Sequence, residues 1–226
     1  MTQNYVKENN LQTAMAEYQD NMGEGRTLYD QYERELGTVT QVYDNTGHVT
    51  LPPGVKELEA LTGSVTGRTM ETVSGDGEQV YAVVKNPKEN AEDVQEVTVL
   101  FRGSTAPMHA FTDFGDVWND WAENDLVIGT RILKQSIPSD RDNSTEQLKA
   151  SARALKDIME KYPNAKINIY GHSLGSMDAQ YAMAALEAAQ IERIQQAYIY
   201  NGPDVYRILS PEQRKIVDQI KGRIYN

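Results

Sequence analysis

Short apolar runs alternate with amphipathic runs in the second half of the sequence, and this alternation limits the possible folds more than any other feature. The apolar runs at 97–101, 167–170 and 197–200 have the length of buried strands. Between them, residues 144–162 and 174–190 carry apolar side chains at helical spacing. Because a helix between two strands usually returns the chain to a parallel neighbour, we expect an α/β fold with a mostly parallel central sheet and flanking helices.

Several local signals refine this expectation. The run at 97–101 is almost wholly apolar, as expected for a central strand that is buried on both faces. Ser144 with Gln147, and Ser210 with Gln213, have the spacing of a capping box, which marks the start of a helix. Residues 223–225 then predict the beginning of a further strand.

The N-terminal part has a different pattern. Residues 4–36 predict two amphipathic helices, separated by Gly23 and Gly25. The second of these helices would carry its apolar residues at helical spacing: Leu28, Tyr29, Tyr32 and Leu36. A loop-rich stretch follows, and it gives no functional clue.

A change of period near residue 65 suggests a domain boundary. Residues 65–73 and 79–85 are rich in β-branched residues and tyrosine, and the turn-forming segment 74–77 separates them, so they predict a β-hairpin. We therefore divide the chain into an N-terminal helical and loop extension, 1–64, and an α/β core, 65–226.

Composition excludes several classes of function. The net charge of −11 disfavours nucleic acid as a partner and restricts any membrane or lipid-interface contact to a local patch. The absence of cysteine excludes disulfides, thiolate metal sites and a cysteine nucleophile, and no metal or cofactor is expected. No apolar run has the length of a transmembrane segment or a signal peptide, so we expect a cytoplasmic chain or one exported without a signal peptide.

The motif that carries chemistry is Gly171-His172-Ser173-Leu174-Gly175, between the strand 167–170 and the helix that follows. This is the context of a nucleophile elbow, in which a serine occupies a strained bend and flanking glycines leave room for it. The bend would expose Ser173 at the carboxyl ends of the strands, beside the N-terminus of a helix. Ser173 is therefore the predicted nucleophile. The alternative is an ordinary strand–turn–helix junction in which Ser173 caps the helix.

Together with Phe101-Arg102-Gly103-Ser104 upstream, this motif resembles the fungal-type (class 3) lipases of the α/β-hydrolase superfamily. The resemblance covers roughly residues 79–226. It implies the α/β-hydrolase fold and a serine lipase, phospholipase or esterase that cleaves carboxylic esters of lipid-like substrates through an acyl-Ser173 intermediate. It also implies an oxyanion hole formed by Ser104, through its backbone N–H and hydroxyl, and by the backbone N–H of Leu174.

His172 occupies the variable position of the motif. A histidine next to the nucleophile on a sharp bend faces away from it, so we expect a packed, hydrogen-bonded side chain rather than a catalytic base.

The segment 107–125 predicts an amphipathic aromatic helix. Its aromatic residues, at helical spacing, are Phe111, Phe114, Trp118 and Trp121. Such a stripe is typical of a core-facing helix, but its position after the oxyanion strand is also that of a lipase lid or acyl-pocket wall. Both interpretations stay open.

The catalytic triad is incomplete in this sequence. A hydrolase of this fold needs an acid and then a histidine after the serine, whereas no histidine follows His172. We expect that the C-terminal part is missing and that the triad acid and histidine lie beyond Asn226, so neither Asp204 nor Asp218 is assigned the role. Two alternatives remain: a non-catalytic α/β-hydrolase-like binding or interaction protein, and a hydrolase that uses His109 as its base.

Overall fold

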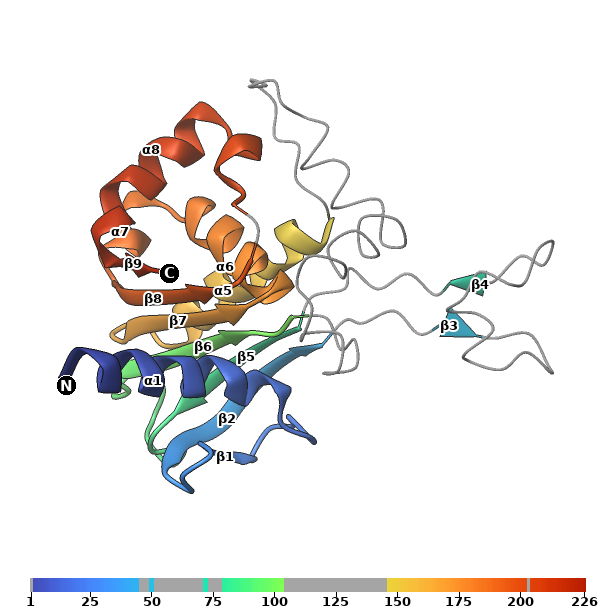
Figure 1. Cartoon of the computed structure of the whole chain (residues 1–226), viewed down its shortest axis with the longest axis vertical. Helices are drawn as coiled ribbons and strands as arrows, with labels where there is room; N and C mark the ends of the chain where they lie inside the picture. The colour runs from blue at the N-terminus through green and yellow to red at the C-terminus, as the bar shows by residue number, and fades with distance from the viewer. Residues whose placement is uncertain (1, 45–48, 51–70, 73–78, 104–145, 203) are drawn as a thin grey trace.

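A mixed β-sheet of seven strands forms the centre of the described chain (Figure 1). The computed structural model describes residues 2–44, 49–50, 71–72, 79–103, 146–202 and 204–226. In spatial order, the strands of the sheet are β1 (Thr27–Tyr29), β2 (Glu35–Asp44), β5 (Gln79–Val84), β6 (Glu96–Phe101), β7 (Lys166–His172), β8 (Ile194–Tyr200) and β9 (Ile224–Tyr225). Two short strands, β3 (Val49–Thr50) and β4 (Glu71–Thr72), pair with each other.

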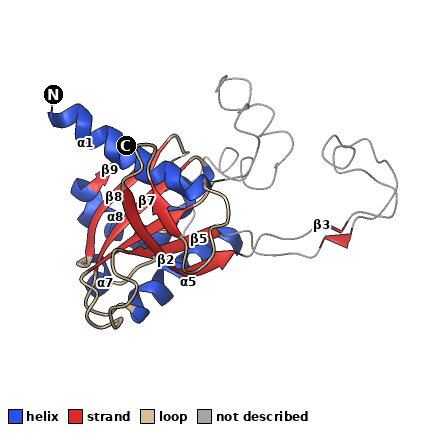
Figure 2. Cartoon of the chain, turned by 90° about the horizontal axis from the view of Figure 1, so that it is seen from below, coloured by secondary structure: helices blue, strands red, loops and turns tan. Residues whose placement is uncertain are grey.

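Helices cover both faces of the sheet, as the sequence predicts. On one face lie α1 (Thr2–Met15) and the 3-10 turn η1 (Ala16–Tyr18); on the other lie α5 (Glu146–Lys161), α6 (Leu174–Ala184) and α8 (Pro211–Ile220) (Figures 1 and 2). The remaining helical segments are α7 (Ala188–Ile191), η3 (Tyr206–Ile208) and η4 (Lys221–Arg223). Among the residues that the structure describes, no helix combines the length and the apolarity needed to cross a bilayer.

The sheet is antiparallel in its first half and parallel in its second. β1, β2, β5 and β6 pair antiparallel in turn, whereas β6, β7, β8 and β9 pair parallel. The expectation of a mostly parallel sheet is therefore wrong, although β6 does occupy the central position predicted for residues 97–101. The loop at 85–95 joins β5 to β6 without a helix, and strands joined directly in this way pair antiparallel.

The second predicted N-terminal helix is also wrong, because residues 27–44 form β1 and β2. Leu28 is fully buried while Tyr29 beside it is 46% exposed, which is the alternation of a strand. The turn after β1 is closed by Asp30, whose Oδ1 accepts the backbone N–H groups of Tyr32 (2.8 Å) and Arg34 (2.9 Å). An aspartate that binds nearby backbone N–H groups competes with helix formation, and helical spacing alone does not reveal this competition.

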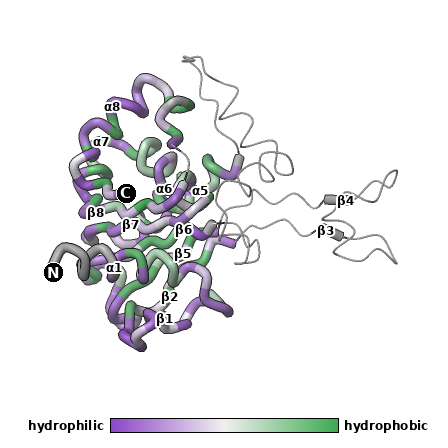
Figure 3. Tube along the Cα trace, viewed as in Figure 1, coloured by the Kyte–Doolittle hydropathy of each residue, from purple (hydrophilic) through white to green (hydrophobic). Residues whose placement is uncertain are grey.

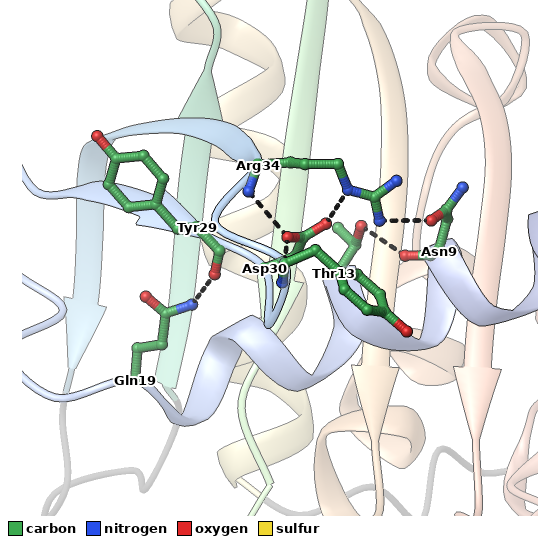
Figure 4. Close-up of polar contacts among 7 residues, drawn as sticks. Asn9, Thr13, Gln19, Tyr29, Asp30 and Arg34 are labelled. Atoms are coloured by element: carbon green, nitrogen blue, oxygen red, sulfur yellow. Dashed lines mark hydrogen bonds and ion pairs between the residues drawn. The ribbon is translucent and has the colours of Figure 1, made fainter.

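The same turn attaches α1 to the sheet (Figure 4). Arg34 donates from Nε to Asp30 Oδ2 at 2.6 Å and from Nη2 to Asn9 Oδ1 in α1 at 2.6 Å. Further along the helix, Asn10 Oδ1 accepts the Tyr170 hydroxyl of β7 at 2.9 Å. The first residues of the chain are thus held across the strands of the core.

The predicted hairpin does not form as expected. β5 has β2 and β6 as its two neighbours in the sheet, whereas β4 pairs with β3. The rest of the expected partner strand and its turn, 65–70 and 73–78, lie outside the described residues. The first 44 residues thus supply β1 and β2 to the central sheet, in addition to the helix α1 that packs on it.

Two hydrophobic cores lie on the two faces of the sheet. The larger core packs α5, α6 and α8 against β5–β8, and the smaller one packs the α1 side against the same strands. Hydrophobic residues line the central strands, whereas the outer turns near β1 are hydrophilic (Figure 3). The predicted apolar face of the helix at 144–162 is confirmed, since its members are buried: Leu148, Ala152, Leu155 and Met159 of α5, and Tyr162 directly after it.

The C-terminal elements largely follow the sequence prediction. The expected single helix at 174–190 is interrupted, because Glu187 and Gln190 form a capping box that starts α7 as a new helix. The predicted capping box of α8 is confirmed, with the Gln213 N–H donating to Ser210 Oγ at 3.2 Å. The predicted strand at 223–225 is present as β9.

A pair of substitutions in β1 tests its assignment as a strand. Leu28→Ala should lower the free energy of unfolding by about 2–5 kcal/mol, because it empties a buried site in the smaller core. Tyr29→Ala, at the exposed neighbouring position, should cost less than about 1 kcal/mol. Urea denaturation of both variants measures the difference, and equal effects would contradict the alternation.

Candidate active site

Ser173 lies on a sharp bend between β7 and α6. Its backbone angles, φ 54° and ψ −123°, are rarely adopted by a residue with a side chain. The bend is held by the Ser173 N–H, which donates to Tyr200 O of β8 at 2.9 Å. The Ser173 side chain makes no capping bond to α6, which argues against an ordinary helix cap, and the residue is partly exposed.

The glycines on either side of Ser173 fit closely against neighbouring backbone. A Cβ on Gly175 would overlap the carbonyl oxygen of Phe101 at the end of β6. A Cβ on Gly171 would lie 2.6 Å from the carbonyl oxygen of Gly175, which is also too close. The predicted need for glycine at both positions is therefore confirmed.

The two sequence motifs lie side by side at the carboxyl ends of parallel strands. Phe101 of β6 pairs with Gly171 of β7. A Cβ on Gly103 would stand 3.3 Å from the Cβ of Ser173. Ser104, the predicted oxyanion residue, lies just outside the described residues, whereas Leu174, the other predicted donor, is the first residue of α6.

His172 is packed and hydrogen-bonded, as the sequence predicts. Its ring is buried, with Nδ1 3.0 Å from the Tyr18 hydroxyl and Nε2 3.5 Å from Nδ2 of Asn201. The Tyr18 ring packs against it edge to face, with 5.8 Å between the ring centroids. Burial lowers the pKa of His172 below its usual value, so the neutral ring is favoured.

Glu17 is the site residue that sequence reasoning missed. Its carboxyl group is fully buried, and Oε1 accepts the N–H of Gly103 at 3.3 Å. Burial raises the pKa of Glu17 well above its usual range, and this effect outweighs the opposing effects of the Gly103 N–H, the Tyr18 hydroxyl, Arg102 and the His172 backbone. In sequence, Glu17 is indistinguishable from the many solvated acids of the chain, so only its packing identifies it.

The other residues considered from the sequence do not join this group. Asp204 is exposed and accepts the Tyr206 N–H, and Asp218 of α8 forms an exposed ion pair with Lys221 of η4, as expected for a solvated residue. His48, His109 and the aromatic segment 107–125 lie outside the described residues. Within the described part of the chain, no cluster of histidine, aspartate and glutamate is arranged to hold a metal ion.

A pocket of about 240 Å³ lies on the face of the sheet that α5, α6 and α8 cover. Its walls come from α6, β8, the turn at 204–209 and α8, and they are mostly apolar. Gln180 of α6 lines it, donating to Ser176 Oγ at 3.3 Å and accepting the Val205 N–H at 3.3 Å. Of the predicted site residues that the structure describes, neither Ser173 nor Leu174 lines this pocket.

The described chain is thus an α/β sandwich with a strained serine bend at the carboxyl ends of its parallel strands. Comparison with known families gives one match: residues 141–224, from just before α5 into β9, are similar to the family described as Mbeg1-like. No curated protein and no solved structure matches the chain. The comparisons therefore assign no activity to the serine bend.

Two glycine substitutions test the close packing of the bend. Gly175→Ala should lower the free energy of unfolding by about 1–3 kcal/mol or more, because the added methyl group overlaps the Phe101 carbonyl. Gly23→Ala is the matched control, since an added Cβ there has open space and the expected change is within about 0.5 kcal/mol. Denaturant melts compare them, and a harmless Gly175→Ala would mean that β6 and α6 are farther apart.

The raised pKa of Glu17 predicts how stability depends on pH. The folded state favours the neutral, protonated form of Glu17. The contribution of this group to the free energy of unfolding is therefore fully present below the pKa of Glu17 in the unfolded chain, near 4.5, and is lost as the pH rises through the pKa of Glu17 in the folded protein. Glu17→Gln stays neutral at every pH. The stability of this variant relative to the wild type should therefore increase from about pH 4 to about pH 8 in urea melts.

The comparison between the two proteins removes the effect of His172. Its lowered pKa has the opposite sign, with stability lost as pH falls, but this contribution is present in both proteins. A difference in stability that stays constant across the pH range would show that Glu17 is not buried as described.

Proposed function

We propose that this protein is a serine hydrolase of the α/β-hydrolase type that cleaves carboxylic esters of lipid-like substrates through an acyl-Ser173 intermediate. The single observation that carries this proposal is the strained backbone of Ser173 between β7 and α6, with a hydroxyl that does not cap the helix. A strained residue that its surroundings hold in place is a feature of functional sites. The preference for lipid-like esters rests on the motif resemblance alone.

In the proposed reaction, Ser173 Oγ forms a bond to the ester carbonyl carbon while a base takes the hydroxyl proton. The oxyanion that develops would accept the backbone N–H of Leu174 and, in this proposal, the N–H and hydroxyl of Ser104. Collapse expels the alcohol, which receives the proton, and water then hydrolyses the acyl-enzyme by the same steps in reverse order. The position of Gly103 against Ser173 supports this assignment, because Ser104 is the next residue.

The base of this reaction is not His172. Its two ring nitrogens face Tyr18 and Asn201, and it is the only one of the three histidines that the structure describes. The other histidines of this sequence, His48 and His109, lie outside the described residues, and we keep His109, which follows Ser104 closely in sequence, as the candidate base.

A second candidate function is a binding or interaction protein that keeps the hydrolase-like bend without catalysis. The observation that favours it is that His172, the one histidine among the described residues, has its two ring nitrogens against Tyr18 and Asn201. The two functions differ in whether Ser173 becomes acylated.

Ester hydrolysis by the gene product read to its stop codon tests the proposal. Ser173→Ala should reduce the release of p-nitrophenol from a soluble short-chain ester and from an emulsified long-chain ester by at least about 10³-fold. Ser151→Ala is the matched control, because it removes another buried hydroxyl, on α5, and should leave the rate unchanged. A fluorophosphonate should label the wild type at Ser173, as a peptide mass measurement would show.

The outcomes separate the alternatives. Hydrolysis that survives Ser173→Ala would contradict the proposed nucleophile, and no hydrolysis of either ester would favour the binding protein. If the 226-residue chain is as active as the full gene product, the base lies within these residues, and His109→Ala should then abolish activity.

A further inference from the structure

Two adjacent residues of the N-terminal segment contact the two segments that meet at the serine site: Glu17 contacts a backbone N–H after β6, and Tyr18 contacts the side chain of the residue before Ser173. Glu17 and Tyr18 belong to η1, which follows α1. The Gly103 N–H donates to Glu17 Oε1 at 3.3 Å, and the Tyr18 hydroxyl lies 3.0 Å from His172 Nδ1. Gly103 directly precedes Ser104, and His172 directly precedes Ser173.

The packing around Gly103 is an independent sign that these contacts are close. A Cβ on Gly103 would overlap the Tyr18 hydroxyl and would lie 2.7 Å from the carbonyl oxygen of His172. Glycine at position 103 therefore lets the N-terminal segment reach the junction between β6 and the serine bend. Arg102 also lies near Tyr18, with its guanidinium 5.9 Å from the centre of the ring.

A carboxyl group at the position of Glu17 is costly for stability alone. Burial of an acid is unfavourable unless hydrogen bonds compensate for it, and an apolar side chain of similar size would fill the same space at a lower cost. Within the described part of the chain, Oε1 binds the Gly103 peptide, and Oε2 is buried without a hydrogen bond. The group is therefore better explained by what it holds than by the stability it adds.

The N-terminal segment is itself fixed in place. Asn9 binds Arg34 (Figure 4), and Asn10 binds Tyr170, so α1 is attached to the turn before β2 and to β7 before η1 begins. Glu17 and Tyr18 thus follow a helix that is attached at two points, and accurate positioning of a site needs such support.

We propose that Glu17 and Tyr18 are positioning residues of the serine site, with Glu17 fixing the peptide before the oxyanion residue and Tyr18 fixing the histidine before the nucleophile. This inference rests on the proposed hydrolase function. It makes the N-terminal segment part of the catalytic unit, because the positions of Gly103 and His172, and with them the bend at Ser173, then depend on contacts made by residues 17 and 18.

The experiment compares three variants of the full gene product: Glu17→Ala, Glu17→Gln and Tyr18→Phe. Glu17→Ala should lower kcat by roughly 10- to 100-fold with KM changed less than about threefold, because a small displacement of an oxyanion donor weakens the transition state selectively. Glu17→Gln keeps an oxygen acceptor for the Gly103 N–H and should restore kcat to within about threefold of the wild type. Tyr18→Phe should lower kcat by about fivefold, the net value of one hydrogen bond.

Two controls separate positioning from loss of stability. Leu28→Ala destabilises the same side of the sheet without contact to the serine bend, so it should lower Tm and leave kcat per folded molecule unchanged. Tyr29→Phe removes the hydroxyl of an exposed tyrosine and should change neither quantity. If Glu17→Ala is folded and its kcat lies within twofold of the wild type, the inference is wrong.

A second measurement does not depend on catalysis. Hydrogen exchange at the Gly103 amide should be faster in Glu17→Ala than in the wild type and close to the wild-type rate in Glu17→Gln. Equal exchange in all three proteins would overturn the role of Glu17, whatever the activity. If the wild type and Ser173→Ala hydrolyse esters equally, the proposed function fails, and altered Gly103 exchange would still show that Glu17 holds this peptide.

Discussion

The contact between Gly175 and the Phe101 carbonyl determines how the rest of this structure is arranged. A helix can begin this close to a neighbouring strand only when its first turn lacks a side chain at the contact. β6 and β7 must also be adjacent and parallel for the two segments to meet, and the pairing of Phe101 with Gly171 satisfies this condition. The strained backbone of Ser173, the start of α6 and the approach of Gly103 all follow from this junction.

The second half of the fold could be predicted from the sequence because its signals are local. The apolar face of α5 and the capping box at Ser210 each depend on residues within a few positions of one another. The glycines of the serine bend are a local signal of the same kind, since their spacing around Ser173 indicates which positions have no room for a side chain. For these elements, the structure confirms what the sequence pattern predicts and supplies the distances.

The first half could not be predicted in the same way because its structure depends on distant partners. β2 is a strand because β1 and β5 flank it, and Asp30 closes its turn through backbone contacts that helical spacing does not indicate. The buried state of Glu17 depends on Gly103, and nothing in the local sequence distinguishes this acid from its solvated neighbours. Burial of an acid is a property of tertiary packing, which a single sequence without partners does not display.

The origin of the site residues along the chain has a consequence for the order of folding. Tyr18 and His172 are separated by 154 positions, and Glu17 and Gly103 by 86. Contacts of such long range form late, because the chain must first lose the entropy of the large loops that they close. During synthesis, residues 17 and 18 are made early, but they can form these contacts only after the serine bend has been made much later. An incomplete chain on the ribosome cannot make these contacts, so the surroundings of the serine bend are completed only when most of the sheet exists.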